Sequence, residues 1–169
     1  MDFKSYIHAH SEELLASLGA LVRIPSVEGA PEEGAPFGRE TARCLDEMLA
    51  LCEKLGFPTS NMDHRVGWCE FGEGEEMVAV LGHLDVVPAG DGWSESEPFS
   101  GEIKNGRIYG RGTMDDKGPM VAAVYALKAL KESGFQPKKR LRVIFGTNEE
   151  TGCGDMAWSA AHGGETPVM

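Results

Sequence analysis

Positively charged residues are scarce in this sequence. Its 169 residues include 16 lysines and arginines against 27 aspartates and glutamates, which gives a formal net charge of -11. A protein that binds nucleic acid needs a basic face to neutralise the phosphates. We therefore predict no nucleic-acid partner, and we expect most of the carboxylates to form a solvated acidic surface.

Long hydrophobic runs and paired cysteines are also missing. No apolar stretch approaches the roughly 20 residues that a membrane-spanning helix needs, and the N-terminal segment lacks the basic-then-apolar order of a signal peptide. The four cysteines form no C-x-x-C pair. Cys44 and Cys52 share one face of a helical pattern, so we expect free thiols in the core. These absences predict a cytoplasmic protein without membrane contact.

The hydrophobic pattern predicts helices and strands within one domain, since the length suits one core better than two. Asn105-Gly106 predicts a two-residue hairpin turn. The order of elements predicts a three-layer αβα domain with a mixed sheet. Helices are expected through Ile7, Leu14, Leu18 and Leu21 up to Pro25, through Leu45, Met48, Cys52 and Leu55, over 117–133 and over 153–161; strands are expected over 65–71, 77–81 and 141–146.

Two of these strand segments, 77–81 and 141–146, are mostly apolar, which predicts strands covered on both faces. Each is followed by side chains that bind metals. The first leads to His83 and Asp85, and the second leads to Glu149 and Glu150. Ligands of open α/β sheets bind beyond the carboxyl ends of the strands, so both clusters fall where a site is expected.

His83 and Asp85 are two residues apart, so both point to the same face of an extended chain. One imidazole nitrogen could then bind a metal while the carboxylate holds the other, which fixes the tautomer. A lone histidine at the end of a strand is more often structural. The spacing alone leaves these two interpretations evenly balanced.

Two pairs of adjacent acids add to the set. Asp115 and Asp116 precede a predicted helix, where carboxylates commonly cap backbone N–H groups, although the glycine-rich approach also suits a metal. Glu149 and Glu150 follow a buried strand, where neighbouring carboxylates repel each other unless a cation lies between them. One histidine with several carboxylates suits zinc, with manganese or cobalt as alternatives, in a two-metal hydrolase.

Three long segments carry a resemblance to a known family. GHLDVVP, GWSESEPFSGEIKNGRIYGRGTMDDKGP and GTNEETG are similar in order and spacing to the metallopeptidase family of aminoacylases, carnosinases, succinyl-diaminopimelate desuccinylase and PepV-type dipeptidases. The stretch from Trp93 to Phe99, followed by DDKGP, resembles the dipeptidase and carnosinase branch. The similarity covers residues 80–152.

The resemblance implies a role for each matching residue. His83 and Glu150 would bind metal, and Asp115 would bridge two Zn²⁺ ions through a carboxylate that precedes a cis peptide bond to Asp116. Asp85 would orient His83. Glu149 would be the general base that takes a proton from a metal-activated water, and the substrate would be a small peptide.

Members of that family are longer and have further ligands after the Glu-Glu pair. We therefore expect residues 1–169 to form the N-terminal part of a catalytic domain, without the C-terminal part or the lid and dimerisation domain. Such a fragment is expected to be inactive alone and to self-associate through open sheet edges. His162 lies in no matching motif and is not expected to be a ligand.

The sequence leaves other functions open. An N-acyl amino acid deacylase of the aminoacylase or desuccinylase type would use the same metal site. A non-catalytic protein on the same fold would be expected to lack one of the five site residues, and none is missing. The glycines from 110 to 112 match no phosphate-binding motif, which disfavours a nucleotide-binding module.

Overall fold

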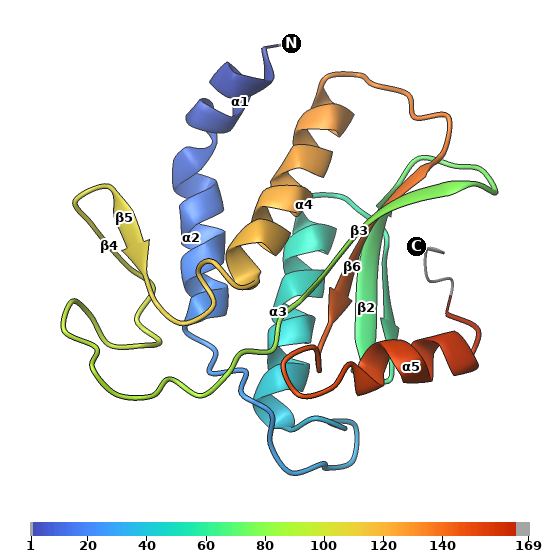
Figure 1. The fold of residues 1–169 in the computed structure, drawn as a ribbon. Helices are drawn as coiled ribbons and strands as arrows, with labels where there is room; N and C mark the ends of the chain where they lie inside the picture. The colour runs from blue at the N-terminus through green and yellow to red at the C-terminus, as the bar shows by residue number, and fades with distance from the viewer. Residues whose placement is uncertain (1, 165–169) are drawn as a thin grey trace.

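A computed structural model describes residues 2–164 as helices packed around a small sheet (Figure 1). Residue 1 and residues 165–169 of the predicted domain lie outside the described residues. The elements in chain order are α1 (Phe3–Ala9), α2 (Ser11–Val22), α3 (Arg39–Lys54), β1 (Thr59–Met62), β2 (Val66–Phe71), β3 (Met77–His83), β4 (Glu102–Lys104), β5 (Arg107–Tyr109), α4 (Lys117–Glu132), β6 (Arg140–Gly146) and α5 (Gly154–Ala161).

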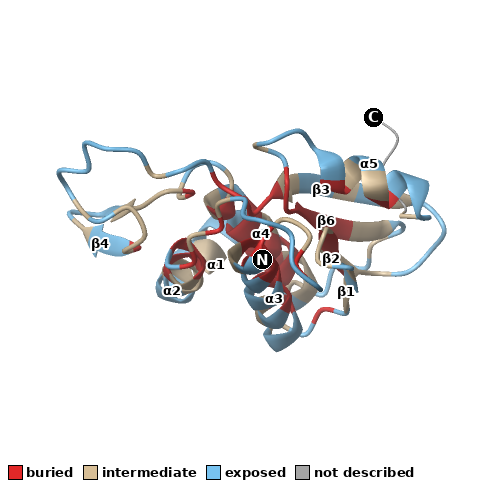
Figure 2. Ribbon diagram, turned by 90° about the horizontal axis from the view of Figure 1, so that it is seen from below, coloured by how far each residue is buried: buried red, intermediate tan, exposed pale blue. Residues whose placement is uncertain are grey.

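The main sheet is mixed, as predicted. Its strand order is β1-β2-β6-β3, in which β6 pairs antiparallel with β2 and parallel with β3. Helices α3 and α4 pack on one face and α5 contacts the other, while α1 and α2 lie outside α4 (Figures 1 and 2). This arrangement confirms the three-layer αβα prediction.

The core lies between the helices and the sheet, where Figure 2 shows the buried residues. Leu21, Leu45, Val121 and Phe145 are among its fully buried side chains. Cys44, Cys52 and Cys69 are buried free thiols, which confirms the expectation for the first two, and Cys153 is exposed. No helix within residues 2–164 is long and apolar enough to cross a membrane.

The prediction that β3 is covered on both faces is wrong. β3 is the last strand in the sheet order, and Val78, Val80 and Leu81 are 54%, 47% and 43% exposed. Its other face packs against α4. Strand β6 lies between β2 and β3 and is buried from Arg142 to Gly146, as predicted.

The predicted first helix is two helices. The chain bends at His10, whose φ of -105° and ψ of 10° end α1, and whose ring lies 4.1 Å from the ring of Tyr6. The His10 Nδ1 also lies 2.8 Å from the Tyr6 carbonyl oxygen. The predicted helix is therefore divided at His10.

The hairpin prediction is confirmed. β4 and β5 pair antiparallel around Asn105 and Gly106, which have φ angles of 53° and 72°. Both values lie in the left-handed region that this two-residue turn requires. The hairpin forms a separate two-stranded sheet on the α2 side of the molecule, away from the main sheet (Figures 1 and 2).

Candidate metal centre

The parallel pairing of β3 with β6 brings the two ligand clusters together. His83, the last residue of β3, is in register with Gly146, the last residue of β6. The Leu84 N–H continues the pairing by donating to the Gly146 carbonyl oxygen at 2.9 Å. The segments that follow the two strands therefore start side by side, at the carboxyl edge where a site was predicted.

The His83 ring is held at both nitrogens. Nδ1 donates to the backbone carbonyl oxygen of Asp85 at 3.0 Å and lies 3.4 Å from Asp85 Oδ1. Nε2 lies 3.1 Å from Asp115 Oδ1 and 3.8 Å from Glu149 Oε2. The contact of Asp85 with the ring thus uses the backbone carbonyl as well as the carboxylate, and Nε2 faces two acids.

The surroundings of His83 favour its charged form in the metal-free protein. Burial of the ring lowers its pKa, but hydrogen bonds and charge from Asp85, with a further contribution from Asp115, more than offset this and raise the pKa to about 9. The ring is therefore positively charged near neutral pH, and Nε2, the nitrogen that would bind a metal, carries a proton.

Asp85 is almost fully buried and anchors the opposite segment. Its Oδ1 accepts from the Glu149 N–H at 3.1 Å, and its Oδ2 accepts from the Glu150 N–H at 3.0 Å. Burial opposes the charged form, but the hydrogen bonds from His83 and these two amides lower the pKa of Asp85. One ionised carboxylate therefore connects the strand that ends in His83 with the loop that carries both glutamates.

Asp115 and Asp116 are joined by a cis peptide bond, as the resemblance implied. Asp116 stands at the N-cap of α4 without a side-chain capping bond, so the capping interpretation is wrong for this residue. Its Oδ2 accepts from the His83 N–H at 3.3 Å. Burial raises the pKa of Asp116, and the charges of Asp115 and Glu149 add to this effect.

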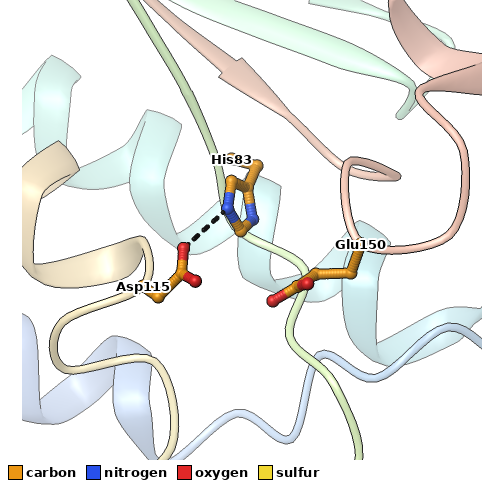
Figure 3. A group of neighbouring side chains, drawn as sticks. All are labelled: His83, Asp115 and Glu150. Carbon is orange, nitrogen blue, oxygen red and sulfur yellow. Dashed lines mark hydrogen bonds and ion pairs between the residues drawn. The ribbon is translucent and has the colours of Figure 1, made fainter.

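Three side chains from three segments can hold a metal ion together. One ligand atom each from His83, Asp115 and Glu150 lies within 4.8 Å of the others (Figure 3). Burial raises the pKa of Glu150, and the charge of Asp115 raises it further. A divalent cation would offset this crowding of carboxylates, so the donor set fits a metal of the zinc type.

The chemistry-bearing residues also line a cleft. His83, Asp116 and Glu149 line it together with the apolar side chains of Leu81 and Met156. The approach is close at Gly82, where a Cβ would meet Asp116 Oδ2 and the end of Met120. A glycine at this point lets the second acidic residue reach the backbone of β3.

Some residues around the centre carry no motif that would have singled them out. The buried Lys117 ammonium donates to the carbonyl oxygens of Leu21 and Ile24, at 3.0 and 2.7 Å, and so ties the Asp115–Asp116 turn to the end of α2. Asp155 is buried beside the glutamate loop. The adjacency of Lys117 to two aspartates was the only available sequence signal, and Asp155 had none.

The remaining histidines lie elsewhere. The His162 ring stacks on Trp158 at 4.1 Å and hydrogen-bonds to its carbonyl oxygen, so it is not part of the ligand group. His64 lies 2.9 Å from Asp46 at the surface. The contacts of His162 agree with the expectation that it is not a ligand.

The chain is similar in sequence to proteins named as dipeptidases. YtjP of Bacillus subtilis (strain 168) is 46% identical over 153 residues, which cover 89% of this chain and 33% of that protein. The Beta-Ala-Xaa dipeptidase of Lactobacillus delbrueckii subsp. lactis is 42% identical over 155 residues, with 89% and 33% covered. The chain thus spans about a third of the length of the curated relatives it matches.

Solved structures have the same fold. Human carnosine dipeptidase 1 superposes with a TM-score of 0.78 at 26% identity, over 94% of this chain and 36% of that chain. The di-peptidase Dug1p from Saccharomyces cerevisiae has a TM-score of 0.72 at 26% identity, over 89% and 35%. Residues 79–166, which span more than half of the sequence, match the sequence model of one protein family. The chain belongs to peptidase family M20/M25/M40, which confirms the resemblance.

Proposed function

We propose that the full-length protein is a metal-dependent hydrolase that cleaves dipeptides. His83, Asp115 and Glu150 are its metal ligands in this chain, with Glu149 as general base and Asp85 as the residue that orients His83. The observation that carries this proposal is the convergence of three ligand atoms within 4.8 Å, with the Glu149 carboxylate 3.8 Å from the same imidazole. Two relatives named as dipeptidases support the substrate class.

The proposed cofactor is a pair of Zn²⁺ ions, with Mn²⁺ or Co²⁺ as alternatives. The family resemblance makes Asp115 the bridging candidate, and its Oδ1 lies 3.1 Å from His83 Nε2. A divalent metal supplies Lewis acidity, which lets a bound water lose a proton near neutral pH. Mixed imidazole and carboxylate ligation suits zinc, and manganese and cobalt can bind the same types of ligand.

The side chains of this chain divide the remaining work. Asp85 fixes the tautomer of His83, since the carbonyl and carboxylate of Asp85 both face Nδ1 and leave Nε2 to the metal. Glu149 is half exposed beside the ligand group, so its carboxylate can accept a proton from water and pass it to the leaving amine. The buried anchor at Asp85 holds this base in place.

The relatives are about three times longer, so the activity is assigned to the full-length protein. Residues 1–169 are proposed to form the N-terminal part of its catalytic domain, with further ligands supplied from outside this sequence. The exposed edge strand β3 supports the expectation that the isolated chain self-associates. The buried free thiols support a reducing, cytoplasmic compartment.

The test is metal content and substrate preference of the full-length protein. About two zinc ions per chain and hydrolysis of dipeptides are expected. If the protein hydrolyses N-acyl amino acids but not dipeptides, the proposed metal site stands and the protein is a deacylase instead of a dipeptidase. Absence of bound metal after reconstitution with zinc, manganese and cobalt would contradict the proposal.

Metal affinity is expected to rise with pH up to about 9. The pKa of His83 in the metal-free protein is about 9, so below that pH a metal must displace a proton from the ring. One displaced proton makes the affinity rise about tenfold per pH unit. Titration of the metal-free protein between pH 7 and 9 checks this, and an affinity that does not change over this range would contradict it.

The raised pKa of His83 also predicts how the stability of the metal-free protein changes with pH. The pKa of His83 is raised from 6.5 in the unfolded chain, so its contribution to stability is fully present below pH 6.5. That contribution is lost as the pH rises through 9. Denaturant unfolding of the metal-free protein should therefore show lower stability at pH 9 than at pH 6.5, and His83→Gln should remove this difference.

A further inference from the structure

Four consecutive backbone N–H groups, those of residues 147–150, donate to two buried carboxylates. Asp155 Oδ2 accepts from the Thr147 N–H at 2.7 Å and from the Asn148 N–H at 3.0 Å. Asp85 accepts the next two, from Glu149 and Glu150, at 3.1 and 3.0 Å. Both aspartates are 1% exposed. The whole segment between β6 and the two glutamates is therefore bonded through its backbone.

The two aspartates approach this segment from different elements. Asp85 follows β3, whereas Asp155 lies in the first turn of α5, where its Oδ1 accepts from the Met156 N–H at 2.7 Å. Asp155 fits only because residue 146 is a glycine, since a Cβ there would lie 2.6 Å from Asp155 Oδ2. The docking of α5 thus determines where the first half of the segment lies.

Three backbone N–H groups compensate the charge of Asp155, and hydrogen bonds to an ionised acceptor are stronger than those between neutral groups. Loss of the carboxylate would leave two buried amides, those of Thr147 and Asn148, without their acceptor. The backbone before Glu149 would then be free to adopt other positions, while the bonds to Asp85 would remain.

We infer that Asp155 is a positioning residue for the Glu149–Glu150 pair. This inference rests on the proposed function, in which Glu150 binds metal and Glu149 is the base. Asp155 acts through the backbone of the segment and does not touch the metal. Together with Asp85 it holds the carboxylates of Glu149 and Glu150 near His83 in one arrangement. Metal binding then does not have to order these side chains, which favours higher affinity.

The competing explanation is that Asp155 only stabilises the start of α5. Tyr125→Phe is a matched control for this explanation. Tyr125 is fully buried, and its hydroxyl bonds to Ser17 at 3.0 Å between α2 and α4. Its removal deletes a partly buried hydrogen bond, but about nine residues along α4, or roughly 13 Å, separate Tyr125 from Asp116.

The experiment compares Asp155→Ala, Asp155→Asn, Tyr125→Phe and Glu150→Gln in the full-length protein. Hydrogen exchange of residues 147–150 is measured without metal, and zinc affinity is measured by competition with a chelator. Asp155→Ala should accelerate exchange at Thr147 and Asn148 and weaken zinc binding about 10- to 100-fold. Asp155→Asn keeps one acceptor oxygen and should restore most of the affinity.

The outcomes separate the two proposals. Zinc affinity and exchange in Asp155→Ala that match Tyr125→Phe would overturn the positioning role. Zinc affinity that stays normal in Glu150→Gln would overturn the proposed metal centre. Loss of affinity in both Asp155→Ala and Glu150→Gln, with normal affinity in Tyr125→Phe, supports the inference.

Discussion

Replacing Glu149 with glutamine is expected to lower kcat of the full-length protein by about 100- to 10,000-fold, the usual contribution of a general base. The amide has nearly the same shape as the carboxylate but cannot accept a proton at neutral pH. Glu149 is outside the group of three candidate ligands, so metal content should not change. Its N–H still donates to Asp85, which preserves the loop. Steady-state kinetics and metal analysis of the purified variant measure both effects.

Glu28→Gln is the control for this experiment. Glu28 is also a surface glutamate near the same loop, where its Oε1 accepts from Asn148 Nδ2 at 3.3 Å, but it does not contact His83. We expect it to retain kcat within a small factor. Full activity of Glu149→Gln would remove Glu149 from the role of base.

Replacing Asp85 with alanine is expected to weaken metal binding by about 10- to 100-fold and to destabilise the metal-free protein by about 3 to 5 kcal/mol. Three bonded groups lose their acceptor or partner at once: the imidazole of His83 and the N–H groups of Glu149 and Glu150. The protonated ring is left partly buried without its carboxylate. Denaturant unfolding and zinc competition measure the two losses.

Asp46→Ala provides a matched histidine–aspartate control. Asp46 lies 2.9 Å from His64 Nε2, but its side chain is 59% exposed. Pairs at the surface contribute about 0 to 1 kcal/mol because water screens them. If both variants lose similar stability and both keep normal metal affinity, the anchoring role of Asp85 is refuted. Asp85→Asn, which keeps one acceptor oxygen, tests the same role in a variant that perturbs packing less.

The ligand clusters could be predicted because each lies in a short contiguous segment after an apolar strand. His83 and Glu150 are 67 positions apart in the sequence, yet the parallel register of β3 and β6 places them at one edge. Strand ends of this kind meet in any open α/β sheet, so composition and order suffice to predict them.

Other features depend on tertiary packing that the sequence pattern does not record. β3 is at least as apolar as β6, which contains Arg140 and Arg142, yet β3 is the edge strand and β6 is the central one. β1 was not predicted, because its four residues, Thr59–Met62, are mostly polar and show no apolar alternation. Asp155 gains its partners only when α5 docks against the end of β6.

The amides of residues 147–150 are turned toward Asp85 and Asp155, and this orientation restricts the chemistry of the cleft. In many hydrolases, backbone N–H groups of an active-site loop donate to the negative charge that develops on the substrate carbonyl oxygen. Here the four backbone N–H groups of residues 147–150 already donate to the carboxylates of Asp85 and Asp155. In the proposed reaction, an oxyanion formed beside Glu149 would therefore be neutralised by cations or by groups other than these four amides.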